Sequence, residues 1–339
     1  MKSILVTGGT GYIGSHTIVA LLMQGYDVIS IDNYHNSFPT IIELIKKIVN
    51  REFIHYEGDC TDFIFLEKMF SQHAIDGIIH FAAMKSVPES LSHPLQYYHV
   101  NINATLELLK AAHTYNVNKF IFSSTCALYD PHALSPVDEY TQVSLESTPY
   151  GLSKLFCENI LRTTASQSNI KVLALRYFNP AGNHPSGILG EWPRNKSENL
   201  FPCIIDALLH DDHLFTIYGN DYDTPDGTCV RDFIHVMDLA EAHIAALSYL
   251  DTPSIPFDII NLGSEKGFSV LDVVQTFETV LNSPLSYIYG PRRKGDIASI
   301  YSSCKKAKEL LHWQCKYNLE DMCRSALLWK EYRSKISSN

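Results

Sequence analysis

The sequence predicts an α/β protein in which a Rossmann-type, doubly wound parallel sheet is joined to a smaller C-terminal α/β domain that binds substrate. Three observations support this prediction. Glycines directly follow the first apolar run, apolar runs alternate with helix-like segments over the first half of the chain, and the composition changes after Asn179. We expect residues 1–178 to form the larger domain, joined by some later segments, and residues 179–339 to form mainly the smaller one.

The first element is a strand, turn and helix built on regularly spaced glycines. An apolar run at residues 4–6 passes into Gly8, Gly11 and Gly14, which lie three residues apart. Gly8 permits the turn, Gly11 lets a pyrophosphate approach the backbone, and Gly14 lets the helix lie close to the strand. Free amide groups and the positive end of the helix dipole favour an anion there without any basic side chain. A flexible glycine-rich loop is the alternative.

A carboxylate follows the second apolar run. Residues 28–31 end on Asp32, eighteen residues after Gly14. An acid at the tip of this strand accepts hydrogen bonds from the adenosine ribose hydroxyls and repels a 2′-phosphate. The strand, the glycines and the acid together predict a site for NAD and not for NADP.

Four more apolar runs are expected to complete the parallel sheet. They cover residues 53–56, 77–81, 119–123 and 171–178. Their apolar residues fall on both faces instead of alternating, which is typical of strands covered by helices on both sides. Between two of them, Ile102, Leu106 and Leu109 recur at helical spacing, so a helix is expected there.

The segment after Asn179 has a different composition. Residues 180–198 are rich in Gly, Pro, Asn and Ser, which indicates a long ordered loop or a domain junction. A helix is expected near residues 204–209 and a further element at residues 269–281. Ligands of doubly wound folds bind beyond the carboxyl ends of the strands, so we expect the active site in the cleft between the two parts.

Composition argues against several kinds of partner. The net charge of −10 disfavours nucleic acid, whose phosphates are bound through a net basic surface. The eight cysteines form no CxxC pair and the chain has no HExxH, so neither a metal site nor a disulfide framework is expected. The chain opens on a core strand, and it has no apolar run of membrane-spanning length. We therefore expect a cytoplasmic protein without a signal peptide or a membrane partner.

A tyrosine and a lysine lie four residues apart, just after a plausible helix start at Thr148 and Pro149. Tyr150 and Lys154 therefore share one helix face. A nearby ammonium group favours phenolate over phenol, so this tyrosine is suited to take a proton from an alcohol. The chain holds 19 tyrosines, so about one such pairing is expected by chance, and an incidental surface pair is the alternative.

Hydroxyl side chains at the end of a neighbouring strand strengthen the case for this pair. The run at residues 119–123 continues into Ser124 and Thr125. These hydroxyls come at the carboxyl edge of the sheet, beside the expected position of the nicotinamide, where Thr125 could hydrogen-bond a substrate oxygen. The alternative is a hydroxyl that only caps the strand end.

Taken together, these motifs resemble those of the extended short-chain dehydrogenases, whose hallmark is a GxxGxxG loop followed by a Ser/Thr, Tyr and Lys trio. Within that family the chain is most similar to the 4-epimerases of UDP-hexoses, over nearly its whole length. The shared segments include residues 7–16, 57–59, 80–82, 175–180, 218–222 and 230–239.

The resemblance implies that UDP-galactose and UDP-glucose are interconverted through a transient 4-keto sugar, with a hydride passing to tightly bound NAD and back. It implies that Tyr150 is the base, that Thr125 helps to hold the 4-hydroxyl, and that Lys154 binds the nicotinamide ribose and lowers the pKa of the tyrosine. Relatives are usually homodimers that pack two helices from each subunit, so a homodimer is expected.

The resemblance also assigns contacts to the two ligands. Beyond the three glycines, the cofactor positions are Tyr12, Ile13, Asp32, Asn33, Tyr34, His35, Asn36, Ser37, Asp59, Cys60, Phe81, Ala82, Ala83, Lys85, Asn101 and, facing the nicotinamide, Phe178. The positions for uridine diphosphate are Asn179, Asn199, Leu200, Thr216, Ile217, Tyr218, Arg231, Arg293 and Asp296. Arginine suits this task because its planar guanidinium grips phosphate oxygens through two hydrogen bonds.

Four positions bear on how this chain differs within the family. Ile300 lies where relatives carry a residue facing the 2-substituent of the sugar; because Ile is branched and stiff, we expect UDP-glucose and UDP-galactose to be preferred over N-acetylated sugars. Thr125 replaces a common Ser and keeps the hydroxyl, and Leu152 replaces a common Lys. Asp130 stands where Gly is usual, and the sequence alone offers no reason for it.

Two other functions share this fold. A nucleotide-sugar 4,6-dehydratase needs a second acid and base, and it places acidic residues directly after the threonine, where this chain has Cys126 and Ala127. A non-catalytic NAD-sensing regulator typically loses the tyrosine and the lysine, which are both present here. The residues therefore favour an epimerase.

Overall fold

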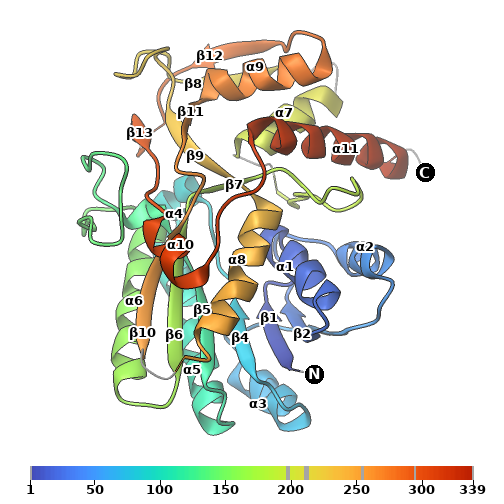
Figure 1. The fold of residues 1–339 in the computed structure, drawn as a ribbon, viewed down its shortest axis with the longest axis vertical. Coiled ribbons are helices and arrows are strands. Elements are labelled where there is room, and N and C mark those ends of the chain that lie inside the picture. Colours follow the sequence, from blue (N-terminus) through green and yellow to red (C-terminus); the bar gives the residue numbers. More distant parts are fainter. Residues whose placement is uncertain (1, 196–198, 210–213, 253–255, 294, 338–339) are drawn as a thin grey trace.

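A seven-stranded sheet, in which every strand pairs in parallel with its neighbours, is the frame of the molecule (Figure 1). The computed structural model describes residues 2–195, 199–209, 214–252, 256–293 and 295–337. Across the sheet the strands are β3 (Ile54–Glu57), β2 (Asp27–Asp32), β1 (Ser3–Thr7), β4 (Gly77–His80), β5 (Lys119–Thr125), β6 (Lys171–Tyr177) and β10 (Phe257–Leu262). The order reverses between β1 and β4, as in a Rossmann fold, which confirms the predicted fold class.

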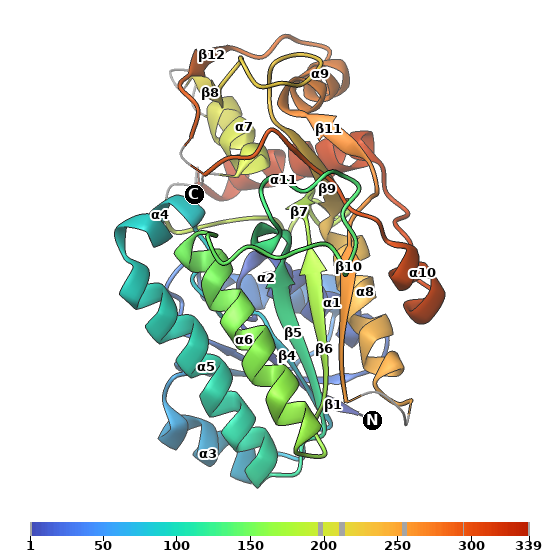
Figure 2. The same ribbon diagram turned by 90° about the vertical axis from the view of Figure 1, so that its left-hand side faces the viewer.

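Helices cover both faces of the sheet. On one face lie α1 (Tyr12–Met23), α2 (Thr40–Val49) and α8 (Val236–Tyr249). On the other face, in front in Figure 2, lie α3 (Phe63–Gln72), α5 (Pro94–Thr114) and α6 (Pro149–Ser166). Ile4 and Val6 of β1 pack in the first core and Leu5 in the second, which explains why this strand is apolar throughout.

The edge strand β3 is less covered than the sequence suggests. Ile54 is 44% exposed, and Glu57 at the other end of the strand is also exposed. The expectation that every strand is covered on both faces is therefore wrong for β3, because this strand pairs only with β2 and lies at the rim of the sheet.

Elements from late in the chain also pack with the large sheet. The strand β10 pairs with β6 at its far edge, and α8 packs against α1. A short helix, α4 (Val87–Ser92), precedes α5, and a 3₁₀ turn, η1 (Cys126–Leu128), follows β5.

The smaller part of the molecule is built around β9 (Val230–His235). This strand pairs with β7 (Asn179–Ala181), β11 (Gly267–Ser269) and β13 (Ser299–Ile300), while β8 (Phe215–Tyr218) pairs separately with β12 (Tyr287–Gly290). Its helices are α7 (Leu200–Leu209), α9 (Val270–Leu281) and α11 (Leu319–Ser337), whereas α10 (Lys305–Leu311) packs against α8 and β10 of the large sheet. Phe201 contacts Phe233 and Phe277 at ring-centre distances of 5.7 and 5.1 Å, so aromatic side chains join these elements.

The predicted loop at residues 180–198 begins with the short strand β7 and is described as far as residue 195. It is held by the C-terminal helix, because Nε1 of Trp329 on α11 donates to the carbonyl oxygen of Glu191 at 3.3 Å. The carboxyl ends of β5 and β6 point toward this smaller part (Figure 2). In the described ranges, every helix is too short or too polar to cross a membrane.

Candidate active site

The turn between β1 and α1 has the conformation that a phosphate-binding loop requires. Gly8 has a φ of +69°, and a Cβ there would lie 2.8 Å from the backbone nitrogen of Ala82. A Cβ on Gly14 would lie 2.1 Å from the carbonyl oxygen of Gly8, so glycine lets α1 pack on the turn. Gly11 is the N-cap of α1, and among these described residues neither a capping side chain nor an acidic first-turn residue competes for the free amides. This helix start therefore fits an anion.

Tyr12 and Ile13 are the first two residues of α1. The hydroxyl of Tyr12 donates to the carbonyl oxygen of Gly182, in the loop that follows β7. Burial raises the pKa of this hydroxyl, so it stays protonated as the donor. The bond ties the glycine turn to the segment that leads into the smaller part of the molecule.

Asp32 ends β2, and its carboxylate organises the turn that follows. One oxygen accepts from the backbone nitrogen of Thr10 at 3.0 Å; the other accepts from the backbone nitrogen of Tyr34 at 2.9 Å and the hydroxyl of Ser37 at 3.2 Å. A carboxylate has about four acceptor sites, so capacity remains for a ribose hydroxyl. Its charge at this place fits NAD better than a dinucleotide with a 2′-phosphate.

The remaining predicted residues of this turn connect to the neighbouring strand end. Nδ2 of Asn33 donates to Asp59 at 2.9 Å, and the backbone nitrogen of His35 donates back to Oδ1 of Asn33 at 3.0 Å. Burial by itself would raise the pKa of Asp59, but hydrogen bonds from Thr61 and Asn33 hold it below its usual value. Cys60 is buried beside it. The structure thus brings these predicted cofactor positions together.

Asn36 lies at the opposite side of the same turn. Its Oδ1 accepts from the backbone nitrogen of Asn195 at 3.3 Å, and Arg194 donates to the carbonyl oxygen of Ser37. The turn after β2 is therefore covered by the loop that follows β7.

The loop after β4 carries four predicted cofactor positions: Phe81, Ala82, Ala83 and Lys85. Asn101 on α5, which is only 2% exposed, holds this loop. Its Oδ1 accepts from the backbone nitrogen of Met84 at 2.8 Å, and its Nδ2 donates to the carbonyl of Met84 at 3.1 Å and to Ser153 on α6 at 2.9 Å. The side chain of Asn101 is thus committed to positioning the loop.

The predicted trio meets at the carboxyl end of β5. The helix α6 begins where the sequence indicates, with Thr148 as its N-cap and Pro149 in the first turn. Tyr150 and Thr125 share a side-chain hydrogen bond. Oγ1 of Thr125 also accepts from the backbone nitrogen of Ala127 at 3.1 Å, so this hydroxyl caps the strand end as well.

Lys154 is nearly fully buried one turn further along α6. Its Nζ donates to the carbonyl oxygen of Ser123 at 2.8 Å and lies 4.8 Å from the ring centre of Phe122. Burial lowers the pKa of Lys154 to about 8.

The pKa of Tyr150 departs from the sequence expectation. Burial raises it to about 12, and the hydrogen bond with Thr125 only opposes that rise. In the chain without a cofactor, desolvation of the phenolate dominates and the ammonium group of Lys154 is directed at the Ser123 carbonyl. That Lys154 lowers the pKa of this tyrosine stays a prediction.

Several predicted substrate residues meet on β9 and β13. Arg231 donates to the carbonyl oxygens of Val230 and Ile297 at 2.9 and 2.7 Å, and its guanidinium lies 3.5 Å from Asp296. Ile300 is in register with Arg231 across the two strands and is 3% exposed. It belongs to the same apolar cluster as Phe178, the residue predicted to face the nicotinamide.

A second group of predicted substrate residues lies around the two-stranded sheet. Thr216, Ile217 and Tyr218 form most of β8. The guanidinium of Arg293 lies 3.9 Å from the ring centre of Tyr218, and the backbone nitrogen of Asp296 donates to the carbonyl of Arg293. Asn179 begins β7, and Leu200 begins α7 directly after Asn199.

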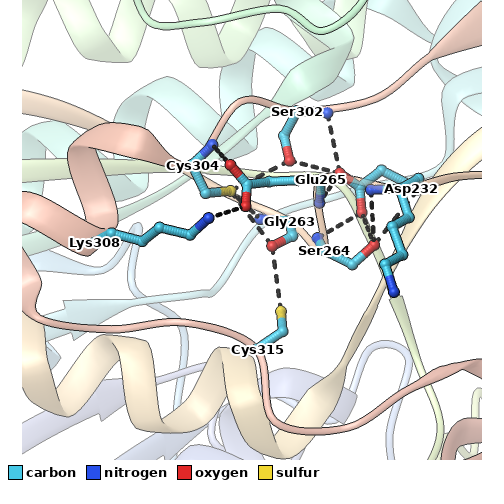
Figure 3. Close-up of polar contacts among 9 residues, drawn as sticks. Asp232, Gly263, Ser264, Glu265, Ser302, Cys304, Lys308 and Cys315 are labelled. Carbon is cyan, nitrogen blue, oxygen red and sulfur yellow. Dashed lines mark hydrogen bonds and ion pairs between the residues drawn. The ribbon is translucent and has the colours of Figure 1, made fainter.

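Asp232 is a buried carboxylate that sequence reasoning missed. One of its oxygens accepts from the backbone nitrogen and hydroxyl of Ser264 at 2.6 and 2.7 Å, and the other from those of Ser302 at 3.0 and 2.5 Å, as Figure 3 shows. These bonds fasten β9, which carries Arg231, to the segment after Ile300. An acidic residue directly before the apolar pair Phe233 and Ile234 is the signal that could have revealed it.

Glu191 is a second residue that sequence reasoning missed. Its side chain is 7% exposed, and one oxygen accepts from Nζ of Lys85 at 3.1 Å and from Nδ2 of Asn199 at 2.9 Å. The backbone nitrogen of Glu191 donates to Asn183 at 2.9 Å, which fixes its position. A single carboxylate thus joins one predicted cofactor position to one predicted substrate position.

Asp130 now has a physical explanation. Its backbone nitrogen donates to the carbonyl of Gln142, and its Oδ1 accepts from the backbone nitrogen of His132 at 2.8 Å. The side chain therefore closes the turn at the start of the loop after η1. Asp130 is absent from the residues with positive φ, so the turn does not require glycine at this position.

Comparison with known proteins assigns this arrangement to a family. The model of the NAD dependent epimerase/dehydratase family matches residues 4–263. The chain belongs to this family. Two relatives of the epimerase/dehydratase family are the UDP-glucose 4-epimerase of Bacillus subtilis, 42% identical over 97% of this chain and 96% of the relative, and UDP-glucose 4-epimerase 2 of Arabidopsis thaliana, 43% identical over 100% and 98%.

Solved structures of the epimerase/dehydratase family agree with this assignment. The UDP-glucose 4-epimerase of Bifidobacterium longum, in complex with NAD+ and UDP, matches with a TM-score of 0.94 at 42% identity, over 97% of this chain and 98% of that one. The structure of the UDP-glucose-4-epimerase from Stenotrophomonas maltophila, with NAD and formylated UDP-arabinopyranose, also matches with a TM-score of 0.94. Its sequence is 37% identical, over 99% of this chain and 100% of that one. The resemblance inferred from the motifs is thereby confirmed, and with it the prediction of an NAD-dependent enzyme.

Proposed function

We propose that this chain interconverts UDP-galactose and UDP-glucose by inverting carbon 4 of the hexose. The observation that carries the proposal is the meeting of Tyr150, Thr125 and Lys154 at the carboxyl end of β5. The names of the relatives support the substrate, since those from Bacillus subtilis and Arabidopsis thaliana are UDP-glucose 4-epimerases. The Bifidobacterium longum structure, which holds NAD+ and UDP, supports the pairing of these two ligands.

The residues present fit NAD. Gly8 and Gly14 let β1 and α1 meet in a turn too tight for a Cβ, the start of α1 offers free amides, and Asp32 has acceptor capacity for the ribose. When bound, the oxidised nicotinamide supplies an acceptor and later a donor of hydride, together with a positive charge. Because the reaction restores the cofactor in each cycle, a tightly retained NAD suits this chemistry better than an exchanging one.

The protein side of the chemistry falls to Tyr150. Its phenolate oxygen takes the proton of the sugar 4-hydroxyl while the hydrogen on carbon 4 leaves with its electron pair, which gives a 4-keto sugar. The keto sugar turns within the site, the hydrogen returns to the opposite face, and Tyr150 gives its proton back to oxygen 4. One C–H bond and one O–H bond break and re-form, so nothing is consumed.

Thr125 and Lys154 support this proton transfer. The Thr125 hydroxyl, which already bonds Tyr150, holds the sugar oxygen at hydrogen-bond distance from the base. The pKa of about 12 in Tyr150 means that positive charge must favour its phenolate form. Lys154 and the cofactor are the proposed sources of that charge.

The uridine diphosphate is assigned to the smaller part of the molecule. Arg231 and Arg293 present guanidinium groups for the phosphate oxygens, and the Tyr218 ring beside Arg293 offers a flat surface for the uracil. The other proposed contacts are Asn179, Asn199, Leu200, Thr216, Ile217 and Asp296.

The residues after Thr125 argue against elimination of water. Cys126 and Ala127 occupy the positions where dehydratases carry acids, and burial raises the pKa of the Cys126 thiol to about 12. A thiol of that pKa does not exchange protons as a carboxyl group does at neutral pH. The proposal therefore includes no dehydration.

One assay tests the reaction and the cofactor together. The purified chain is incubated with UDP-galactose without added NAD, and the products are followed by NMR and mass spectrometry. We expect UDP-glucose to form up to an equilibrium mixture. Formation of a 4-keto-6-deoxy sugar would replace the proposal by a dehydratase, and no turnover even after addition of NAD would reject it.

We further propose a homodimer that packs α5 and α6 of each subunit together. Leu95 is 80% exposed, Leu106 42% and Phe156 41%, so these two helices present apolar side chains to solvent. Sedimentation of the wild type and of a Leu95→Glu/Phe156→Glu variant tests this. A dimer that the variant converts to monomer is expected, and a monomeric wild type at micromolar concentration would reject it.

A cytoplasmic location completes the proposal. All eight cysteines are free thiols, which suits a reducing compartment.

A further inference from the structure

Three successive residues at the end of β5 each bond one residue of α6. Ser123 accepts from Lys154 through its carbonyl oxygen at 2.8 Å, and Thr125 bonds Tyr150. Between them, the hydroxyl of Ser124 donates to Oε1 of Glu158 at 2.5 Å. The helix residues are four apart and therefore lie on one face of α6, which lies in front of the sheet in Figure 2.

The middle contact is reinforced by an ion pair. The Nε and NH2 groups of Arg176 on β6 donate to the two oxygens of Glu158 at 2.9 and 2.6 Å. Arg176 stands opposite Ser124 in the register of β5 and β6. Ser124, Glu158 and Arg176 are 0%, 2% and 3% exposed, so the contacts are shielded from water. One carboxylate thus joins α6 to two neighbouring strands.

An ion pair of this kind is weak evidence for stability, because desolvation offsets much of its attraction. Its contribution is instead a fixed position of α6 relative to the strands. The bidentate contact has fixed geometry, whereas apolar side chains of α6 would tolerate a shift along the strand. A shift of about 1 Å between α6 and β5 would separate Tyr150 from Thr125, and misplacement of that size costs about a hundredfold in rate.

We propose that Ser124, Glu158 and Arg176 are positioning residues that set the register of α6 against β5 and so hold Tyr150 at Thr125. They touch neither ligand; they act through the tyrosine and the threonine. The inference rests on the proposed catalytic role of that pair. The positioning role explains why Ser124, Glu158 and Arg176 form a buried polar cluster although none of them takes part in the reaction.

The decisive variant is Ser124→Ala. It removes the bond to β5 while Glu158 and Arg176 keep their ion pair, so no buried charge is left unpaired. We expect kcat for UDP-galactose to fall about ten- to a hundredfold, with KM within about twofold of the wild type and an unchanged content of bound NAD. Glu158→Gln, which retains an oxygen acceptor, should lose less activity than Glu158→Met/Arg176→Leu.

Leu161→Ala is the matched control. Leu161 is buried on the same helix but faces the apolar core, so its loss lowers the melting temperature without removing a bond to β5. We expect its kcat per folded molecule to equal that of the wild type. If Ser124→Ala behaves like this control, with lower stability and unchanged kcat, the proposal is overturned.

The proposed function fails in a different way. If Tyr150→Phe retains full activity, the assignment of the base is wrong, whatever the activity of the Ser124 and Glu158 variants. If Tyr150→Phe is inactive and Ser124→Ala keeps the wild-type kcat, the base stands and the positioning role is rejected.

Discussion

Oε1 of Glu191 lies 3.1 Å from Nζ of Lys85, so a buried carboxylate in the loop after β7 meets an ammonium group in the loop after β4. The same oxygen accepts from Asn199 at the start of α7. Lys85 belongs to the proposed cofactor contacts and Asn199 to the proposed substrate contacts. The carboxylate therefore connects a proposed cofactor contact with a proposed substrate contact.

Replacing this carboxylate should weaken both sites. In Glu191→Ala, Lys85 and Asn199 lose a shared acceptor; a half-exposed ion pair and one hydrogen bond each contribute about 1 kcal/mol. We expect less NAD to remain after dialysis and the KM for UDP-galactose to rise about five- to tenfold. Glu191→Gln, which keeps an oxygen acceptor, should show a smaller change.

The control for this substitution is Glu241→Ala. Glu241 pairs with Lys316 on an exposed surface away from both sites, so its loss should leave NAD content and KM unchanged. Full retention of NAD together with a wild-type KM in Glu191→Ala would show that the carboxylate does not couple the sites.

How much the sequence predicts depends on how far apart the interacting residues lie. Gly8, Gly14 and Asp32 are recognisable because their spacing along the chain reports the turn directly. Glu191 and Lys85 are 106 residues apart, and Asp232 and its partner in the segment after β13 are 70 apart, so no local pattern reveals either contact.

The electrostatics of the site depend even more strongly on the fold. The sequence places Lys154 one helical turn from Tyr150, which is correct, and from this it predicts a lowered pKa for the tyrosine. Whether burial or the neighbouring charge dominates is decided by packing from several elements. In the folded chain burial dominates, and the pKa rises to about 12.

Substrate range should depend on Ile300. Its side chain is buried in the cluster that contains Phe178, where it narrows the space proposed for the sugar. Ile300→Gly should raise kcat/KM for UDP-N-acetylgalactosamine at least about tenfold, a change of about 1.4 kcal/mol, while the value for UDP-galactose changes little. The large-to-small change should also cost about 3 kcal/mol of stability.

Ile300→Leu tests whether the volume of this side chain, and not isoleucine itself, excludes the N-acetyl group. It keeps the side-chain volume, so it should continue to exclude the N-acetyl group. Equal turnover of both sugars by the wild type, or no gain in Ile300→Gly, would show that this residue does not face the 2-substituent.

Stability should fall in mild acid because four histidines are buried in the neutral form. Burial lowers the pKa of His16 and His80 to about 3 and that of His235 and His243 to about 4. Below about pH 6.5 these histidines bind protons in the unfolded chain but stay neutral in the folded chain. The free energy of unfolding therefore decreases as pH falls from about 6.5 toward 4. Each histidine contributes a slope of up to about 1.4 kcal/mol per pH unit, measurable by urea unfolding at pH 7.5, 6 and 5.

His243→Phe tests the source of that slope. The His243 ring lies 4.7 Å from Phe81, and its Nε2 has no hydrogen-bond partner within the described part of the chain. A phenyl ring fits this apolar setting, so the variant should unfold with a shallower dependence on pH. His132→Gln, at an exposed position, is the control and should keep the wild-type slope. Identical slopes for both variants would assign the acid sensitivity elsewhere.

Removal of one oxygen from the proposed base should remove most of the activity. Tyr150→Phe deletes the hydroxyl that bonds Thr125 and leaves the ring in place. General base catalysis contributes about 10²- to 10⁴-fold, so we expect kcat for UDP-galactose to fall within that range, with unchanged circular dichroism and NAD content. Thr125→Ser, which keeps a hydroxyl at the strand end, should retain most of the wild-type rate.

Tyr249→Phe distinguishes a catalytic hydroxyl from a structural one. The hydroxyl of Tyr249 donates to Asp258 at 2.9 Å at the opposite end of the sheet, so its loss removes a hydrogen bond without touching the site. We expect lower stability and a normal kcat in this variant, the reverse of Tyr150→Phe. A wild-type rate in Tyr150→Phe would mean that another group takes the proton, and the neighbouring hydroxyl of Thr125 would be the first to replace, by Thr125→Val. A drop in both variants would instead indicate that losing any buried tyrosine hydroxyl disturbs the fold.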